Sequence, residues 1–137
     1  MKLTLRLATM KDAAFLLRVR NDPETRQWSW HHDRITPQAH REWLQKALLY
    51  KVPLVYIALL RGTRVGTIRV ARTVRNEDEV SIAVSPEHRG KGYGTAMLQA
   101  LPSHRVPLRA TIDLGNMASV RAFIKAGFTV RYTATKE

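Results

Sequence analysis

The 137-residue sequence contains no cysteine. This absence excludes a disulfide-stabilised scaffold, a zinc site built from thiolates and a cysteine nucleophile. A long apolar segment is also lacking: the longest uncharged apolar stretch, residues 52–60, is far shorter than the roughly 20 residues that cross a bilayer. Charges are spread through the N-terminal residues, which argues against a signal peptide. We therefore expect a soluble, cytoplasmic protein with no membrane partner.

Length and composition are those of one globular domain spanning residues 1–137. Hydrophobic residues make up 45% of the chain and charged residues 25%, so it is able to bury a core and is not expected to be disordered. No repeat, low-complexity segment or linker divides it.

Negative charge is scarce. The chain has 23 Lys and Arg but only 11 Asp and Glu, for a formal net charge of +12. Such an excess favours polyanionic partners, including multiply phosphorylated cofactors or substrates. The basic residues are scattered and do not interleave with aromatic residues, so nucleic acid is not the favoured partner, and a solvated basic surface accounts for most of the charge.

Hydrophobic periodicity predicts a mixed α/β (α+β) fold whose sheet is built largely from hairpins in its first half. Thr36-Pro37 is a strong helix start, since a hydroxyl cap precedes proline at the first helical position. We expect either Trp43, Ala47 and Tyr50 or Leu44 and Leu48 to face inward from that helix. Asn21-Asp22-Pro23 should end the first helix, with residues 28–32 in a loop. The predicted strands cover residues 3–7, 55–60, 65–73, 79–84, 108–113 and 128–133, and the predicted helices residues 9–20, 36–50, 95–101 and 116–125.

The most informative segment is the glycine-rich turn at residues 89–94, Arg-Gly-Lys-Gly-Tyr-Gly, which follows the strand at 79–84 and leads into a helix. Glycines permit the positive φ angles that let several backbone N–H groups converge on an anion. Arg89 and Lys91 add positive charge there. The spacing fits neither a P-loop nor a Rossmann fingerprint. A simple helix-capping turn remains an alternative explanation of the glycines.

Two separated motifs resemble the GCN5-related N-acetyltransferase (GNAT) family. The first is Arg-x-x-Gly-x-Gly, with Arg89, Gly92 and Gly94, after a strand that ends Val-Ser-Pro; the second runs from Asn116 to Gly127-Phe128. The predicted order of elements also agrees with the family fold, a single mostly antiparallel sheet that is splayed where acetyl-CoA binds. The resemblance covers nearly the whole chain. It is closest to subsets that acetylate nucleotide-linked amino sugars and, more loosely, the N-termini of ribosomal proteins.

The resemblance implies an acetyl-CoA site and no metal. Backbone groups of the strand would pair with the pantetheine arm, amides of the glycine turn would hold the pyrophosphate, and Asn116 would hydrogen-bond the arm. The residues implied in cofactor binding are Ile82, Ala83, Val84, Arg89, Gly90, Lys91, Gly92, Tyr93, Gly94, Thr95 and Asn116.

Glu79 is the candidate general base, acting through a water, because it lies on the strand that would orient the thioester. A surface carboxylate in an acidic turn is the alternative. Many family members carry a tyrosine that protonates the departing thiolate; here that position is Phe123. Protonation is then left to water, to the amine's own proton or to another residue, while Tyr93 and Tyr132 are expected to pack.

The acceptor is expected to contact the N-terminal half, where Asn21 and Trp28 are candidate pocket residues. Trp28 and Trp30 would form an apolar wall or, equally, anchor the core. His31, His32 and His40 lack paired carboxylates at ligand spacing, so we expect no metal site.

Three functions therefore remain open. They are an acetyltransferase for an amino-sugar nucleotide, a protein N-terminal acetyltransferase, and a non-catalytic acyl-CoA- or RNA-binding module. Only residues 129–137 follow Gly-Phe, so the last hairpin is predicted to be incomplete or completed by a second chain in a homodimer.

Overall fold

A computed structural model describes residues 2–29, 31–72, 77–102, 107–113 and 115–129. Within these residues one sheet has the strand order β1-β2-β3-β4-β5, antiparallel except for the parallel β4–β5 pair. The predicted mixed, mostly antiparallel sheet is confirmed. The strands are β1 (Leu3–Leu7), β2 (Leu54–Leu60), β3 (Thr63–Arg72), β4 (Asp78–Val84) and β5 (Leu108–Arg109).

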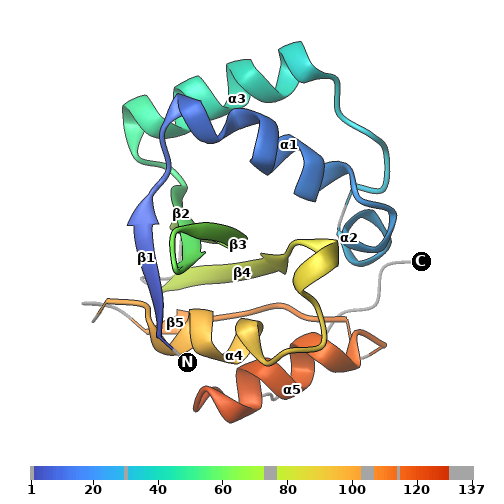
Figure 1. Cartoon of the computed structure of the whole chain (residues 1–137), viewed down its shortest axis with the longest axis vertical. Helices are drawn as coiled ribbons and strands as arrows, with labels where there is room; N and C mark the ends of the chain where they lie inside the picture. Colours follow the sequence, from blue (N-terminus) through green and yellow to red (C-terminus); the bar gives the residue numbers. More distant parts are fainter. Residues whose placement is uncertain (1, 30, 73–76, 103–106, 114, 130–137) are drawn as a thin grey trace.

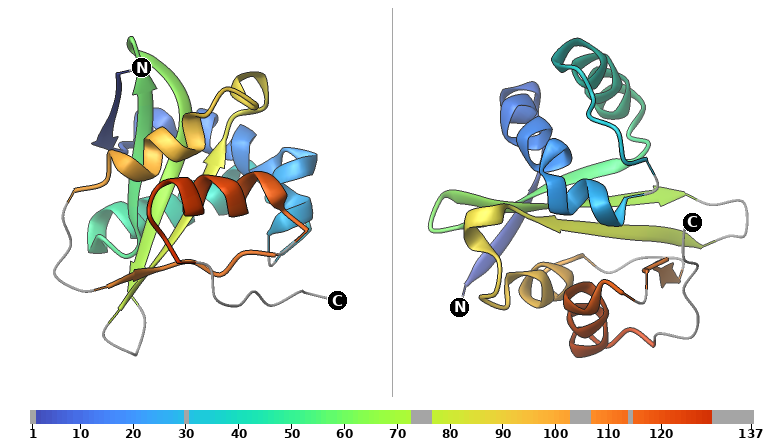
Figure 2. Two further views of the ribbon diagram at one scale, coloured as in Figure 1. Left: turned by 90° about the horizontal axis from the view of Figure 1, so that it is seen from below. Right: turned by 90° about the vertical axis from the view of Figure 1, so that its right-hand side faces the viewer.

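Helices cover both faces of the sheet. In Figure 1, α1 and α3 lie on one face and α4 and α5 on the other, and the right-hand view of Figure 2 shows the same three layers. None of the described helices is long and apolar enough to span a membrane. The helices are α1 (Ala13–Asn21), α2 (Pro23–Trp28), α3 (Pro37–Tyr50), α4 (Tyr93–Gln99) and α5 (Met117–Lys125).

Each face of the sheet has its own hydrophobic core, because side chains alternate between the faces of a strand. The core beneath α1 and α3 is built from Ala8, Phe15, Leu16, Val19, Leu44, Ala47, Val55 and Ile57. The core beneath α4 and α5 contains Ala58, Val65, Ile68, Val70, Val80, Met97, Leu98, Ile112, Ala122 and Phe123. Strand β4 contributes to both: Val80, Ile82 and Val84 pack towards α4 and α5, whereas Ala83 packs against the other core.

Local signals explain how several elements begin. Thr9 and Asp12 form a reciprocal capping box at the 3-10 turn that leads into α1. The Thr36 side chain accepts a hydrogen bond from the Ala39 N–H and starts α3 where predicted. Arg61 and Gly62 have φ angles of 53° and 79°, as the tight β2–β3 turn requires.

No helix was predicted at residues 23–28, and Trp28 was expected in a loop, whereas the structure forms a helix there. Asn21 ends α1 as expected, but the chain does not enter a loop. Asp22 accepts a hydrogen bond from the Thr25 N–H, and Pro23 occupies the first turn of a second helix, α2. An Asp-Pro pair both ends one helix and starts the next, just as Thr36-Pro37 starts α3.

Other predicted boundaries need correction. Tyr50 is 69% exposed, and the buried face of α3 is formed by His40, Leu44 and Ala47. Only Leu108–Arg109 of the strand predicted at 108–113 pairs in the sheet, and α4 ends at Gln99 rather than near residue 101. The strand predicted at 128–133 does not form at residues 128–129, and its remainder lies outside the described residues, as do Trp30 and Tyr132.

Candidate active site

Strand β4 forms the centre of the site because one of its edges is only partly paired. β3 pairs with β4 along its whole length. On the other edge, β5 pairs only with Asp78 and Glu79 and then leaves the sheet. Among the described residues, no strand pairs with this edge between Val80 and Val84, which we call the open edge. The predicted splay in the sheet therefore begins directly after Glu79.

The hydrogen-bonding pattern of β4 determines which backbone groups face the open edge. The Ser85 N–H donates to the Val65 carbonyl on β3 at 2.9 Å. Because antiparallel partners alternate between bonded and non-bonded pairs, the N–H and C=O groups of Ala83 also face β3. Those of Ile82 and Val84 face the open edge, where an extended ligand with amide groups would find unpaired donors and acceptors.

The turn after β4 is anchored at its start by Ser85, which is fully buried. Its hydroxyl lies 3.2 Å from the Val65 carbonyl and 2.6 Å from Nδ1 of His88. Gly90 and Gly92 follow with φ angles of 75° and 79°, a left-handed conformation that other residues adopt only with strain. The glycines are thus required by the backbone path of the turn.

Space above the turn is open. A Cβ atom at Gly90 or Gly92 would meet no atom within 4 Å. Gly92 precedes α4 without a side-chain cap, so the N–H groups of Gly94 and Thr95 have no partner within the helix. Lys91 is exposed beside them. The turn therefore offers backbone donors and one flexible cation to a ligand from solvent.

Gly94 has a different role from its two neighbours. A Cβ there would lie 3.4 Å from Ala122 Cβ and from Ile82 Cδ1, so its small size lets α4 approach both α5 and β4. Tyr93 is half-buried against the core, and its ring lies 6.2 Å from that of His88. Tyr93 therefore packs, as expected.

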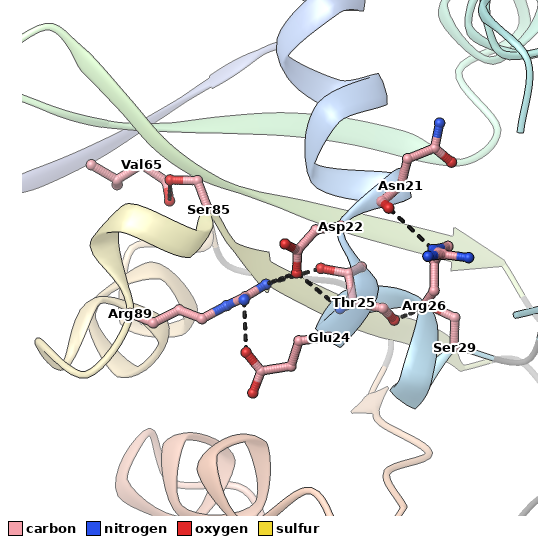
Figure 3. Close-up of polar contacts among 9 residues, drawn as sticks. All are labelled: Asn21, Asp22, Glu24, Thr25, Arg26, Ser29, Val65, Ser85 and Arg89. Atoms are coloured by element: carbon pink, nitrogen blue, oxygen red, sulfur yellow. Dashed lines mark hydrogen bonds and ion pairs between the residues drawn. The ribbon is translucent and has the colours of Figure 1, made fainter. Parts of the chain in front are cut away.

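Arg89 does not point its charge across the turn, contrary to what its position in the motif suggests. Its Nη2 donates to Asp22 Oδ2 at 2.8 Å and to Thr25 Oγ1 at 3.1 Å, and its Nη1 donates to Glu24 Oε2 at 2.7 Å (Figure 3). Burial acts to raise the pKa of Asp22, but the hydrogen bonds from Arg89 and Thr25 lower it below its usual value. Arg89 thus joins the glycine turn to the start of α2.

The other end of α2 reaches the second motif. Two ring carbons of Trp28 lie 3.2 Å from the position that a Cβ of Gly115 would occupy. Next to Gly115, Asn116 caps α5: its Oδ1 accepts from the Ser119 N–H at 3.4 Å, and its Nδ2 donates to Ser119 Oγ at 3.0 Å. The structure therefore places Trp28 against the residue before Asn116, so α2 reaches from the glycine turn to the second motif.

Glu79 lies at the fork of the sheet. It pairs in register with Ala71 of β3 and with Arg109 of β5, and it is the last residue of β4 to contact β5. Arg109 is itself bonded to Glu77 at 2.8 Å, which raises the pKa of the guanidinium. Glu79 is half-buried and belongs to the face that also carries Ser81 and Ala83, towards α1 and α3.

Phe123 is 2% exposed and packs edge-on against Phe128, with ring centroids 5.0 Å apart. A side chain at this position of α5 is enclosed in apolar surroundings and carries no titratable group. Among the described residues, no tyrosine replaces it at the fork.

Asn21 uses its side chain within the fold. Its Nδ2 donates to the Ile35 carbonyl at 2.8 Å, and its Oδ1 accepts from the Ile35 N–H at 2.9 Å. Asn21 also lines an open surface depression of about 650 Å³, together with Asp22, Arg34 and Pro86. Its amide therefore holds the loop before α3, at the rim of a depression that reaches the end of β4.

The described residues contain no group of three or more metal-binding side chains. His40 is buried on α3, and its burial, together with the nearby positive charges of Arg69 and Arg20, lowers its pKa. The imidazole of His40 is thus held neutral at physiological pH.

Comparison with known proteins supports this geometry. Residues 2–129 match the acetyltransferase (GNAT) domain family. No curated protein sequence matches the chain significantly. Among solved structures, an aminoglycoside acetyltransferase in complex with coenzyme A and kanamycin is 25% identical, with a TM-score of 0.80, and the alignment covers 95% of this chain and 86% of that one.

Two further structures show the same fold. Spermidine N-acetyltransferase from Vibrio cholerae, in complex with CoA and spermine, has a TM-score of 0.83 at 16% identity, covering 95% of this chain and 82% of that one. Ribosomal-protein-alanine N-acetyltransferase from Brucella melitensis has a TM-score of 0.72 at 25% identity, with coverage of 90% and 82%. Because the family match spans nearly the whole chain and includes the open edge and the glycine turn, the chain belongs to the GNAT family of acetyl-CoA-dependent N-acetyltransferases.

Proposed function

We propose that this chain transfers the acetyl group of acetyl-CoA to the primary amine of a nucleotide-linked amino sugar. The observation that carries the proposal is the open edge of β4, which begins at Glu79 and ends at the glycine turn. The pyrophosphate would bind the N–H groups of residues 90–95, and the pantetheine arm would pair with Ile82 and Val84. The thioester then lies near the fork, on the far side of the open edge from the phosphates.

The chemistry is direct attack of the amine nitrogen on the thioester carbonyl. The C–N bond forms, the C–S bond breaks, and the thiolate leaves. Holding the two reactants in line can supply roughly 7–11 kcal/mol of the barrier reduction. A backbone N–H on the open edge would stabilise the oxyanion. Glu79 would accept the amine proton through a water. Because Phe123 has no ionisable proton to donate, the departing thiolate would be protonated by solvent or by the proton released from the amine.

Nucleotide-linked amino sugars combine a primary amine with a diphosphate, which suits a chain of net charge +12. Protein N-terminal acetylation is the second candidate, favoured by the similarity to the Brucella melitensis enzyme. Asn21 and Trp28 would border the acceptor in either case, because they lie near the two ends of α2, which reaches from the glycine turn to the second motif.

Cofactor binding is tested with Gly92→Glu. Acetyl-CoA should raise the melting temperature of the wild-type protein, and the shift should be lost in the variant, because a carboxylate would occupy the space above the turn and φ at this position disfavours any side chain. Gln38→Glu, on the exposed surface of α3, is the charge-matched control and should keep the shift. An unshifted wild type would refute the proposed activity.

The role of Glu79 is tested with Glu79→Gln. The variant should lower kcat about 100-fold and flatten the rise of turnover with pH, because the base has been removed while the shape of the side chain is kept. Glu42→Gln, an exposed carboxylate of α3, provides the comparison. A variant with the wild-type pH profile would show that Glu79 is only a surface carboxylate.

A further inference from the structure

Arg69 occupies a distinctive place on the acceptor side of the sheet. It pairs in register with Ser81 of β4, one strand away from the open edge. Its neighbours along β3, Ile68 and Val70, belong to the core beneath α4 and α5. Since side chains alternate along a strand, Arg69 faces α1 and α3, on the face that also carries Glu79.

The guanidinium of Arg69 is held by an aromatic ring instead of a carboxylate. Its central carbon lies 5.4 Å from the ring centroid of Trp43 on α3, a distance typical of a cation–π contact. Among the described residues, no carboxylate forms an ion pair with it. Residue 69 is solvent-exposed, so its guanidinium is both oriented by the Trp43 ring and accessible to a ligand from solvent.

Several other arginines of the described chain are paired with carboxylates. Arg6 and Arg64 contact Asp12, Arg89 contacts Asp22, and Arg109 contacts Glu77. Others, such as Arg41 and Arg72, are exposed and form no ion pair among the described residues, but Arg69 differs from them because an aromatic ring orients it on the face that carries Glu79. Its charge is therefore held in place and available to an anionic ligand.

A second cation lies near Arg69. The charge of Arg20 contributes to lowering the pKa of both Arg69 and His40. Its Nη1 and Nη2 donate to the carbonyls of Asp33 and His31 at 3.4 and 3.3 Å, and among the described residues no carboxylate forms an ion pair with it. The His40 ring lies 5.7 Å from that of Trp43 and adds no charge while neutral. We call Arg69, Arg20, Trp43 and His40 the Arg69 cluster.

We propose that the Arg69 cluster binds an anionic phosphate group of the amine acceptor, so that the enzyme selects phosphate-bearing amines and rejects polycationic ones. This inference rests on the proposed function and assigns a site to the acceptor's diphosphate. A guanidinium presents paired N–H donors that match two oxygens of a phosphate, and the Trp43 ring fixes the orientation of that fork. The same charge repels a polyamine.

Polycation rejection would set this enzyme apart from two of its structural neighbours, which were crystallised with kanamycin and with spermine. The shared fold therefore does not imply a shared acceptor. Specificity would reside in the charge of the face that carries Arg69 and not in the cofactor site.

The test uses inorganic pyrophosphate as the probe and isothermal titration calorimetry in 150 mM NaCl. The protein is first saturated with CoA, so that the glycine turn is filled and cannot take up the probe. Wild type should bind pyrophosphate, and Arg69→Ala should bind it at least 10-fold more weakly. Arg69→Gln removes the charge but keeps more of the side chain. It should show the same loss of pyrophosphate affinity, and it replaces Arg69→Ala in the test if that variant does not fold. Arg41→Ala, an exposed arginine on α3, should bind as wild type does.

Spermine is titrated in parallel and should not bind the CoA-saturated wild type. The proposal is overturned if pyrophosphate does not bind, if both Arg69 variants bind it as wild type does, or if spermine binds in its place. Failure of CoA to bind would instead contradict the proposed function. Pyrophosphate would then be titrated into the Gly92→Glu protein with and without Arg69→Gln, which still tests the Arg69 cluster.

Discussion

The layer of α4 and α5 and the layer of α1, α2 and α3 are attached to the same sheet by different kinds of contact. On the cofactor side, backbone and apolar groups approach closely: Gly66 and Gly94 leave room for neighbouring atoms, and Met97 is fully buried. In the layer of α1, α2 and α3, ion pairs join distant segments, as Asp12 does with Arg64 and Asp22 with Arg89.

This difference fits the tasks that we propose for the two layers, cofactor binding for one and acceptor binding for the other. Acetyl-CoA is the same molecule throughout the family, so a rigid, close-packed backbone frame serves every member. The acceptor varies, and polar contacts between side chains can be exchanged with less disturbance to the core. We therefore expect the largest losses of free energy of unfolding from mutations in the backbone packing around α4 and α5. The smallest losses should come from mutations in exposed ion pairs of the layer of α1, α2 and α3.

The largest effect is expected from Gly66→Ala. The new Cβ would lie 2.7 Å from the Ala83 carbonyl oxygen and 2.9 Å from the side chain of Met97, both too close for contact. Separating α4 from β3 should lower the free energy of unfolding by about 3 kcal/mol, measured by urea denaturation. Gly90→Ala is the control, because it adds strain at positive φ without any clash and should cost only about 1 kcal/mol. Equal losses in the two variants would contradict the packing argument.

Asp12→Asn should have an intermediate effect. Asp12 is fully buried, accepts from Arg6 at 2.8 and 2.9 Å and from the Thr9 N–H, and lies 3.3 Å from Arg64. Losing charged hydrogen bonds should cost about 2 kcal/mol at pH 7. Glu42→Gln, an exposed position, should change the free energy of unfolding by less than about 0.5 kcal/mol.

The pH dependence of the Asp12 contribution follows from its lowered pKa, caused first by the Arg6 hydrogen bonds. The stabilisation is fully present above the unfolded-state value near 3.8 and is lost as the pH falls below it, through the folded-state pKa. The difference between wild type and Asp12→Asn should therefore shrink in acid. A difference that stays constant down to pH 2 would mean that the charge of Asp12 is not the stabilising feature.

Sequence patterns were most informative where the structure depends on neighbours along the chain. The glycine turn requires positive φ at Gly90 and Gly92, which the local sequence supplies. The strand predicted at 79–84 forms, and its alternation places Val80 and Ala83 on opposite faces of the sheet. The caps at Thr9 and Thr36 are likewise local. The start of α2 at Asp22-Pro23 carried the same signal as Thr36-Pro37 and was missed because its other function, ending α1, was considered alone.

Contacts between distant segments were beyond local patterns. Arg89 and Asp22 are 67 residues apart, and only the folded sheet brings them together. The placement of Arg69 over Trp43 depends on the register of β3 and on the rotation of α3, where His40, Leu44 and Ala47 rather than Tyr50 face inward. The sequence showed many arginines without indicating which would lack a carboxylate.

The smallest effects are expected at the link between the two layers, where Arg89 contacts two carboxylates that differ in exposure. The Asp22 side chain is 15% exposed and that of Glu24 is 57% exposed. Double-mutant cycles of Arg89→Gln with Asp22→Asn and with Glu24→Gln should give coupling free energies of about 1 and about 0.3 kcal/mol, measured by urea denaturation. Raising NaCl to 1 M should remove the second coupling and leave most of the first, because exposed pairs are screened more strongly.

The functional consequence of breaking the link distinguishes it from ordinary stabilisation. Because Arg89 lies in the glycine turn but fixes α2, Arg89→Gln should raise the KM for the acceptor more than the KM for acetyl-CoA, whose phosphates we propose to bind to backbone N–H groups. Asp22→Asn should reproduce that pattern from the other side of the pair, although it lies outside the turn. A rise confined to the KM for acetyl-CoA would show instead that the guanidinium serves the phosphates, and the two layers would then be less coupled than the ion pair indicates.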